Sequence, residues 1–391
     1  MQELFIKDLH VRLPGKEILK GIHLEIRKGE FISLLGPSGC GKTTLIKTIA
    51  GLLQPDQGEI FIRGQNAHPL APEKRGTVIV FQDLRLFPNL NVLENVEFGM
   101  RMKRVPKGLR QQKALSLLEK VEMTGFEKRR VNALSGGQKQ RVALARAIAA
   151  EPSILLLDEP FTSLDVNTKE KMIELVLRLH QDLNITTVMV THDQRDALLM
   201  SARIAVMSDG KILQYDTSKR VYEAPTSPYV ADYFGKTNYL QGMVKGGTFR
   251  SLLGDFSVSL PEGPYQMMIR PNHLRILAKP GDFQILSVSF LGDRINALLV
   301  YQDQELWVTA GPDVELTVGE RVSLDVDFSK GVFYKNSETS KGRGLSVADC
   351  RKMLFESGFT SLRRGDESMI PLDLEYLKKT DLKNDISRLF R

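Results

Sequence analysis

The chain carries, from residue 31 to residue 44, the stretch Phe31-Ile-Ser-Leu-Leu-Gly-Pro-Ser-Gly-Cys-Gly-Lys-Thr-Thr44. Its first part, residues 31–35, is a short and largely apolar run that is typical of a buried strand. A glycine-rich segment, residues 36–43, follows directly, and residues 44–53 continue with the apolar spacing of a helix. We therefore expect a strand, a glycine loop and a helix in immediate succession.

The glycine segment has the pattern Gly-x-x-x-x-Gly-Lys-Thr, which matches the phosphate-binding loop in full. Glycines let backbone N–H groups close around phosphate oxygens, and the start of the following helix favours negative charge. Lys42 is expected to reach the outer phosphates and Thr43 to ligate Mg²⁺. A redox role for Cys40 is the weaker alternative. The residues predicted to bind the nucleotide here are Gly36, Pro37, Ser38, Gly39, Cys40, Gly41, Lys42, Thr43 and Thr44.

A pair of acids at the end of a second apolar run completes the predicted metal site. Residues 154–157 read as a buried strand, and Asp158 and Glu159 follow it directly. In open α/β sheets ligands bind beyond the carboxyl ends of the strands, which is where this pair stands. We expect Asp158 to hold Mg²⁺, directly or through water, and Glu159 to polarise an attacking water.

The apolar pattern predicts an α/β fold for residues 1–235. Runs at 78–81, 154–157 and 187–190 have the composition of strands that are buried on both faces, as in a parallel sheet. Between residues 84 and 150 the pattern is almost wholly helical, with helix-forming composition at 110–123 and 138–150. This region is predicted to be a helical insert on the sheet domain.

The character of the sequence changes near residue 235. Residues 236–336 hold short β-type segments separated by Gly, Pro and Asp turns, which predicts a small all-β domain or barrel. A third piece, residues 337–391, begins with a linker-like run and has two stretches that could form short amphipathic helices, 347–355 and 374–390. The expected β segments are 238–244, 267–270, 283–291, 297–300, 305–309 and 321–326.

Another glycine motif, Leu134-Ser-Gly-Gly-Gln138, precedes the acidic strand end. With the phosphate loop and the acidic pair, this order and spacing resemble the ABC-type ATPase domain, whose signature loop the five residues match. The resemblance implies that two copies pair head to tail, because one chain cannot easily offer both phosphate sites to the same nucleotide. The residues that would then close over ATP held by Lys42 of the other copy are Ser135, Gly136, Gly137 and Gln138.

Three further matches follow the family's order along residues 1–235. Gln82 resembles the loop glutamine that senses Mg²⁺ and the attacking water and links the site to a membrane partner. Asp165, in Ser163-Leu-Asp165, resembles the loop that crosses the dimer interface, and His192 resembles the switch histidine that contacts the γ-phosphate. The family's aromatic partner for adenine is missing, so we expect Leu13 and Ile18 to offer apolar contact instead.

ABC-type ATPase domains occur in transporters and in soluble proteins that act on nucleic acid or ribosomes, and the β-rich region favours the transporters. Residues 268–274 and 290–294 resemble segments of the small β-barrel domain on ATPase subunits of bacterial importers that use a substrate-binding protein. The resemblance implies ATP and Mg²⁺ as cofactors, two membrane-spanning subunits as partners, a binding protein as an indirect partner, and uptake of a small solute, with iron and polyamine ranked first. Leu86 and Phe87 are candidate contacts for the membrane subunit. The alternative is a soluble ABC-type ATPase acting on nucleic acid or ribosomes.

Composition agrees with a globular protein. The chain has 391 residues, of which 42% are hydrophobic and 26% charged, enough for sizeable cores. It lacks an apolar run long enough to span a bilayer and an N-terminal secretion signal, so we expect a cytosolic protein or a peripheral one on the cytosolic face of the membrane. Two cysteines are too few for a disulfide framework. The net charge of +7 is mild for this length and does not by itself indicate nucleic acid.

Overall fold

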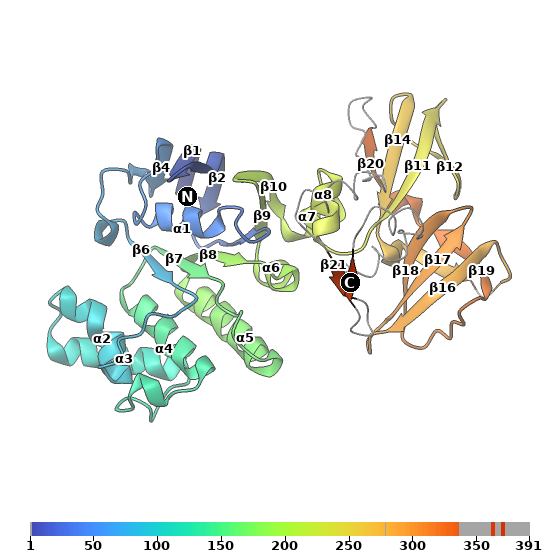
Figure 1. The fold of residues 1–391 in the computed structure, drawn as a ribbon. Helices are drawn as coiled ribbons and strands as arrows, with labels where there is room; N and C mark the ends of the chain where they lie inside the picture. Colours follow the sequence, from blue (N-terminus) through green and yellow to red (C-terminus); the bar gives the residue numbers. More distant parts are fainter. Residues whose placement is uncertain (1, 278, 336–360, 364–368, 372–391) are drawn as a thin grey trace. The chain divides into compact units, whose positions relative to one another are not determined.

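The structure is a computed structural model that describes residues 2–277 and 279–335 in full and the backbone of 361–363 and 369–371 (Figure 1). The chain divides into two compact units, one of Met1–Tyr239 with Met268–Val332 and one of Leu240–Met267 with Phe333–Arg391. The helices predicted at 347–355 and 374–390 lie outside the described residues. Two short strands, β21 (Ser361–Arg363) and β22 (Met369–Pro371), pair antiparallel. The domain limits at 235 and 336 stay predictions.

A six-stranded sheet forms the centre of the first unit, in the order β10-β9-β3-β8-β7-β6. All neighbouring strands in it are parallel except β9 and β10, which confirms the predicted α/β fold. Every residue of β3, β7 and β8 is buried, as expected for central strands of a parallel sheet that is covered on both faces. The strands are β3 (Phe31–Leu35), β6 (Thr77–Val80), β7 (Ile154–Asp158), β8 (Thr186–Thr191), β9 (Arg203–Ser208) and β10 (Lys211–Thr217).

A second, antiparallel sheet of order β2-β1-β4-β5 was not anticipated from the sequence. Its strands are β1 (Gln2–Leu13), β2 (Lys16–Arg27), β4 (Gln57–Ile62) and β5 (Gln65–Asn66). The alternation of buried Ile22, Leu24 and Ile26 with exposed His23 and Glu25 along β2 is the period of a strand with one face in the core. This alternation was the signal that could have predicted the sheet.

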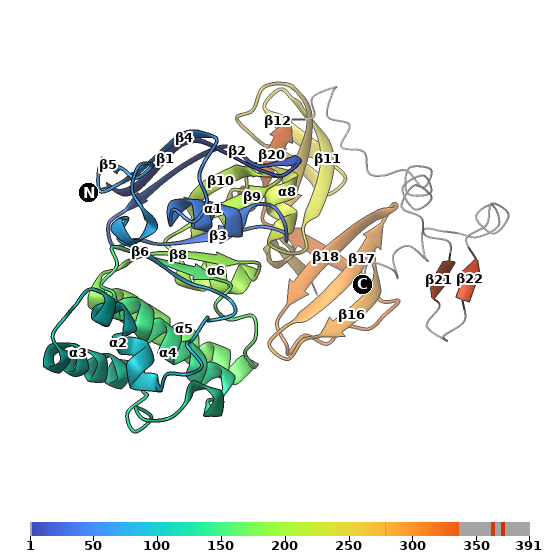
Figure 2. The ribbon, with the colours of Figure 1, turned by 60° about the vertical axis from the view of Figure 1, so that its left-hand side comes forward.

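The helices cover the two faces of the central sheet (Figures 1 and 2). Alternate residues of β7 enter different cores: Leu155 and Leu157 pack with the helical insert, whereas Ile154 and Leu156 pack with α1 and the antiparallel sheet. The predicted insert is thus fastened to one face of the sheet through a shared core. The helices are α1 (Lys42–Ile49), α2 (Val92–Met102), α3 (Lys107–Lys120), α4 (Gly136–Ala149), α5 (Val166–Leu183), α6 (Gln194–Met200), α7 (Ser218–Glu223) and α8 (Pro228–Tyr233), with short 3₁₀ helices at Pro72–Lys74, Val131–Ala133, Pro271–His273 and Phe328–Lys330.

The region after residue 235 is β-rich, as predicted, and the strands between residues 238 and 335 divide between two five-stranded sheets. One has the order β13-β12-β11-β14-β20, with strands β11 (Asn238–Lys245), β12 (Thr248–Ser251), β13 (Gly254–Ser257), β14 (Gly263–Ile269) and β20 (Val332–Lys335). The other has the order β15-β19-β16-β17-β18, with strands β15 (Leu274–Leu277), β16 (Phe283–Phe290), β17 (Ile295–Tyr301), β18 (Gln304–Ala310) and β19 (Arg321–Val326).

Within the first unit, one buried arginine ties residues 268–332 to the ATPase fold. The guanidinium of Arg270 donates to the carbonyl oxygens of Ala231 at 2.9 Å and Tyr222 at 3.1 Å. Asn238 and Trp307 exchange two further hydrogen bonds of 2.7 Å each. Buried polar groups of this kind have to be paired, so both contacts specify how this part of the chain attaches.

Candidate functional site

The phosphate loop takes the shape that its glycines permit. Gly39 has φ of 79° and Gly41 has φ of 107°, in the left-handed region that glycine enters without strain. A side chain at Gly36 would collide with the carbonyl oxygen of Met207 on β9, so the loop lies directly against the sheet. The first turn of α1 starts at Lys42, immediately after Gly41, so the N-terminus of the helix opens onto the loop.

Lys42 is buried and folds back over its own loop. Its ammonium group donates hydrogen bonds to the carbonyl oxygens of Gly36 at 2.6 Å and Pro37 at 2.8 Å. A buried ammonium needs such partners, because without them its desolvation would be costly. The positive charge is thereby held at the centre of the loop, where phosphate oxygens would meet it.

Thr43 and Asp158, which come from distant parts of the sequence, lie in direct contact. The Thr43 hydroxyl donates to Asp158 Oδ1 at 3.0 Å. Asp158 is buried, and burial raises the pKa of its carboxyl group above the ordinary value, although the Thr43 hydrogen bond opposes the shift. Hydroxyl and carboxylate oxygens are the ligands that Mg²⁺ prefers, and a cation would offset the cost of keeping this carboxylate ionised. The pair therefore fits a magnesium ion.

Glu159 and His192 are brought together from the ends of the neighbouring strands β7 and β8. Glu159 Oε2 lies 3.3 Å from His192 Nδ1 and accepts a hydrogen bond of 3.1 Å from the Thr162 hydroxyl. The backbone of Glu159 has φ of 47°, and its N–H donates to the carbonyl oxygen of Val190 at 3.0 Å. This uncommon backbone conformation turns the carboxylate toward the end of β8. The side chain of Glu159 keeps an exposed fraction of 22%, so water can reach it.

Gln82 lies at the exposed turn after β6. Within the described part of the chain, no hydrogen bond links its side chain to Thr43, Asp158 or Glu159. The structure thus brings together four of the predicted site residues, Thr43, Asp158, Glu159 and His192, and shows no hydrogen bond from them to Gln82 among the described residues.

The signature loop caps a helix. Ser135 is the N-cap of α4, which begins at Gly136, two residues earlier than predicted. The Ser135 hydroxyl accepts from the Gln138 N–H at 3.3 Å, and the Gln138 side chain accepts from the Ser135 N–H at 3.0 Å. This capping box satisfies two otherwise free donors of the first turn.

The two glycines of the signature loop have different surroundings. No described atom lies within 4 Å of a side chain built at Gly136, whereas one at Gly137 would approach Thr168 of α5 at 2.8 Å. Asp165 caps α5 and accepts a 3.0 Å hydrogen bond from the Thr168 N–H, and the interactions with Thr168 lower its pKa. The signature loop therefore lies against the start of α5, and its open side is at Gly136.

The predicted adenine contacts lie at the hairpin of β1 and β2. A side chain at Gly41 would approach Leu19 at 2.8 Å and the carbonyl oxygen of Ile18 at 3.2 Å, so β2 passes directly beside the phosphate loop. Leu13 ends β1 and is 37% exposed. This edge offers apolar surface next to the loop.

An ion network behind His192 was not found from the sequence. Lys169 of α5 lies 2.6 Å from Asp193 Oδ2 and 2.8 Å from Asp196 Oδ1. Asp193 follows His192 directly and caps α6 by accepting from the N–H groups of Arg195 and Asp196. The helix that Asp165 begins is thus tied to the turn that carries His192. The N-cap position of Asp193 was the only signal in the sequence.

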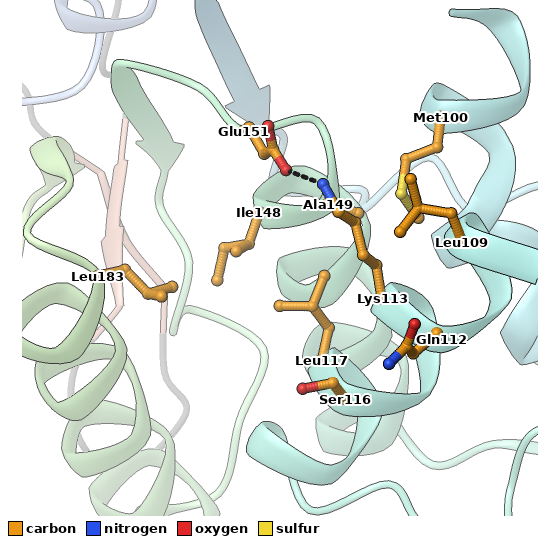
Figure 3. Close-up of a pocket in the computed structure, with 10 residues that line it drawn as sticks. All are labelled: Met100, Leu109, Gln112, Lys113, Ser116, Leu117, Ile148, Ala149, Glu151 and Leu183. Carbon is orange, nitrogen blue, oxygen red and sulfur yellow. Dashed lines mark hydrogen bonds and ion pairs between the residues drawn. The ribbon is translucent and has the colours of Figure 1, made fainter. Parts of the chain in front are cut away.

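A cavity of about 470 Å³ lies elsewhere, between α3 and the ends of α2, α4 and α5 (Figure 3). Lys113 and Glu151 form an ion pair of 2.6 Å in its lining. None of the predicted site residues takes part in it; the lining residues are Met100, Leu109, Gln112, Lys113, Ser116, Leu117, Ile148, Ala149, Glu151 and Leu183. This cavity is therefore distinct from the phosphate loop and the strand ends.

Two further observations concern the described residues as a whole. They contain no helix that is both long and apolar enough to cross a membrane. They also contain no group of three or more His, Cys, Asp and Glu side chains arranged to hold a metal ion.

The comparisons with known proteins identify the family. The sequence profile of the ABC transporter family matches residues 19–162. The chain is 43% identical, over 270 residues, to the spermidine/putrescine import ATP-binding protein PotA of Borrelia garinii, covering 68% of this chain and 78% of that protein. It is 40% identical over 319 residues to PotA of Acetivibrio thermocellus, covering 79% and 90%. It is 36% identical over 310 residues to the Fe(3+) ions import ATP-binding protein FbpC of Vibrio cholerae, covering 77% and 88%.

Solved structures share the fold of the first part of the chain. The ATP-binding cassette MJ0796, solved as a dimer in a post-hydrolysis state with ADP and Pi, has 34% identity and a TM-score of 0.50, covering 55% of this chain and 98% of that one. The cassette cbiO1 of Clostridium perfringens has 30% identity and a TM-score of 0.53, covering 56% and 90%. The alignment with PotA of Acetivibrio thermocellus, at 319 residues, extends beyond the cassette into the β-rich region. The chain therefore belongs to the ABC transporter family, as an ATP-binding subunit of the import type with a C-terminal domain.

Proposed function

We propose that this chain powers the uptake of a polyamine or of ferric iron by hydrolysing ATP at the strand ends. The observation that carries the catalytic part is the convergence of Thr43, Asp158, Glu159 and His192 beside the phosphate loop. The names of the relatives support the solute class, since two of them are spermidine/putrescine import ATP-binding proteins and one is an Fe(3+) ions import ATP-binding protein. The relatives named for polyamine have the higher identities, so polyamine is the first solute to test.

The phosphate loop and the strand ends divide the work of hydrolysis. Lys42 exchanges its bonds to the carbonyls of Gly36 and Pro37 for oxygens of the outer phosphates. Thr43, Asp158 and Gln82 would hold Mg²⁺, which when bound neutralises charge on the phosphates. Among the described residues, no hydrogen bond joins the Gln82 side chain to Thr43 or Asp158, so its part in holding the ion is the least supported of the three.

Glu159 and His192 act on the water and the γ-phosphate. Glu159 accepts a hydrogen bond from the attacking water and orients it, and the contact of 3.3 Å with His192 holds the carboxylate in place. His192 also donates to the γ-phosphate as charge develops there. Phosphoryl transfer depends mainly on such positioning and on charge stabilisation, so each of these residues matters through its place.

A second copy of the chain completes the site. In each copy Ser135 and Gln138 cap their own helix, and Gly136 is open to a partner. The backbone N–H groups at the start of α4 form an anion site that would meet the γ-phosphate bound by Lys42 of the other copy. Asp165 would cross the interface beside them. The dimer of MJ0796 supports this arrangement.

The membrane subunits would meet the segment that follows Gln82. Phe87 packs against Phe98 with tilted rings whose centroids are 4.1 Å apart, and Leu86 packs on the core of the helical insert. Both side chains therefore also serve the fold, and the contact with two membrane-spanning subunits would use their remaining exposed edges. In this proposal the chain works on the cytosolic face of the membrane, and a substrate-binding protein acts from the opposite side.

Reconstitution tests the proposal. The chain is combined in proteoliposomes with the two membrane subunits and the binding protein that co-purify with it, and ATPase turnover is measured with spermidine, putrescine or ferric iron. Stimulation by a polyamine or by iron is the expected result. If neither stimulates turnover, the solute class is wrong; if nucleic acid co-purifies in place of membrane subunits, the chain is a soluble ATPase and the importer assignment fails.

A further inference from the structure

The segment after Gln82 has an unusual backbone. Leu84 has φ of 57° and Arg85 has φ of 45°, so two successive residues with side chains adopt the left-handed conformation. This conformation is unfavourable for residues other than glycine, and it persists only where surrounding structure imposes it. Some contact must therefore hold the chain in this shape directly after Gln82.

Arg146 of α4 supplies that contact. Its Nη1 donates to the carbonyl oxygen of Arg85 at 2.7 Å, and its Nη2 donates to the carbonyl oxygen of Leu84 at 2.7 Å. The same guanidinium lies 5.3 Å from the centre of the Phe87 ring. The planar guanidinium of Arg146 thus binds the carbonyl groups of Leu84 and Arg85 at the same time and faces the ring of Phe87. The ammonium group of a lysine cannot reproduce this forked geometry.

Among the described residues, the other hydrogen bonds and ion pairs of the segment stay within it or lead to α2, although Leu84 and Leu86 also pack on the apolar core of the insert. The guanidinium of Arg85 lies 3.8 Å from the centre of the Phe81 ring and pairs with Asp83, so these contacts stay inside the segment. The N–H of Phe87 donates to Asn95 at 2.9 Å, which fastens the far end of the segment to α2. Within the described part of the chain, Arg146 provides the hydrogen bonds between the near end of the segment and α4.

The position of Arg146 on α4 connects the segment after Gln82 with the helix that begins at the signature loop. The helix begins at the signature loop, with Ser135 as its N-cap, and Arg146 stands in its last turn. A shift of the helix that accompanies binding at the signature loop would move the carbonyls that Arg146 holds. We propose that Arg146 is a positioning residue that sets the place of Gln82 in hydrolysis and couples it to the signature helix. This inference rests on the role of Gln82 in the proposed function.

Arg141 is a matched control on the same helix. Its Nη1 donates to the carbonyl oxygen of Val121 at 2.9 Å and pairs with Glu122 at 2.6 Å. It therefore resembles Arg146 in residue type, helix and bonding to a backbone carbonyl, but its partners lie after α3 and not in the segment of Gln82. Removing it tests the loss of a helix arginine without disturbing that segment.

The experiment is a double-mutant cycle on steady-state ATPase activity. The variants are R146M, Q82A and their combination, with R141M and its combination with Q82A as the control cycle. We expect R146M to lower kcat about 10-fold with KM within about twofold, because misplacement by about 1 Å can cost that much or more. The kcat of the variant that combines R146M and Q82A should lie within about twofold of the kcat of the slower single variant. The reductions in kcat caused by R141M and by Q82A should instead multiply in their combination.

A lysine at position 146 adds an independent readout. Arg146→Lys keeps the positive charge and loses the fork, so we expect kcat to stay close to that of R146M. Arg146→Lys also takes the place of R146M in the double-mutant cycle if R146M does not fold. Full recovery of kcat by lysine would show that charge alone is needed and would overturn the inference.

The remaining outcomes separate the inference from the proposed function. If R146M lowers only the melting temperature, or if its effect multiplies with that of Q82A, Arg146 is merely structural and the inference is wrong, while the proposed function stands. If Q82A by itself leaves kcat unchanged, the role proposed for Gln82 fails, and the inference fails with it.

Discussion

The hydroxyl of Thr43 donates a hydrogen bond of 3.0 Å to Asp158 Oδ1, which joins the first turn of α1 to the last residue of β7. The two residues are 115 positions apart in the sequence. Parallel strands place their carboxyl ends at one edge, and the phosphate loop leaves β3 at that same edge. The contact therefore shows how the sheet brings together, from two separate motifs, the two residues proposed to hold Mg²⁺.

Asp158 should show opposite effects on stability and activity. Burial raises the pKa of its carboxyl group above the ordinary value of 3.8, so the folded state binds the proton more tightly than the unfolded state does. At pH values above this raised pKa, ionisation of the buried Asp158 therefore lowers the stability of the folded state. D158N removes this cost and keeps an oxygen that can accept from the Thr43 hydroxyl. We expect the melting temperature of D158N at pH 7.5, measured without nucleotide, to rise by about 2 °C.

The same variant should lose activity, because an amide neutralises less of the charge of a bound cation. Mg²⁺-dependent ATPase turnover of D158N is expected to fall by about 100-fold or more. Asp56, whose carboxylate accepts from the N–H of Arg12 in an exposed position, offers a control. D56N should leave turnover within about twofold. A D158N protein that melts lower and hydrolyses normally would contradict both the burial argument and the metal assignment.

Glu159 should be required for hydrolysis and not for nucleotide binding. E159Q keeps the shape of the side chain and removes the charge that polarises water, so turnover should fall about 100-fold or more. Because ATP then persists, the head-to-tail dimer should accumulate in ATP with Mg²⁺, measured by light scattering coupled to size exclusion. The Thr162 hydroxyl, which donates to Glu159 at 3.1 Å, provides a milder variant, and T162V should slow turnover by less than about 10-fold. Normal turnover in E159Q would rule out Glu159 as the catalytic carboxylate.

Lys169 should stabilise the fold in a way that depends on pH. K169M leaves Asp193 and the buried Asp196 without their shared cation, so two carboxylates repel each other next to His192. Removing one partner of a largely buried ion pair costs about 3 kcal/mol, and the partial exposure of Lys169 reduces that to about 1–2 kcal/mol.

The direction of the pH effect follows from Asp196. Burial raises the pKa of its carboxyl group above the ordinary value, and loss of Lys169 removes an interaction that opposes this shift. Protonation of Asp196 therefore relieves the variant as pH falls. The difference in free energy of unfolding between K169M and the parent, measured in urea, should be smaller at pH 5 than at pH 8, and K169R should restore most of it. A difference that is constant across this range would argue against the carboxylate repulsion.

Leu13 should accept an aromatic ring. It is 37% exposed at the end of β1, and the neighbouring β2 passes beside Gly41 of the phosphate loop. In L13Y a ring could stack on adenine, which should tighten ATP binding by about 3- to 10-fold in isothermal titration, as expected from about 0.5–1.5 kcal/mol of stacking. Leu52, which is 51% exposed on another part of the first unit, gives the control L52Y, with affinity unchanged. Unchanged or weaker binding in L13Y would show that adenine lies elsewhere.

The strands and loops that hold the candidate site residues could be predicted from the sequence because their patterns are local. Residues 31–35 are strand β3 as predicted, and the buried strand that ends at Asp158 was placed to within one residue. Glycine spacing requires only neighbouring backbone geometry, and a continuous apolar run requires only burial on both faces. The β-rich character after residue 235 is equally local, since it follows from short apolar segments between turn residues.

The contacts between those elements were decided by tertiary structure alone. No local pattern states that β8 lies between β3 and β7, and this order is what places His192 beside Glu159. In the antiparallel sheet, the hairpin of β1 and β2 is local and its alternation could have been recognised, whereas the pairing of β4 with β1 joins separate parts of the chain. Arg146 read as an ordinary helix former, and only the packed structure reveals that it holds the carbonyls of Leu84 and Arg85. Residue types and spacing specify each motif, whereas long-range packing chooses which motifs meet.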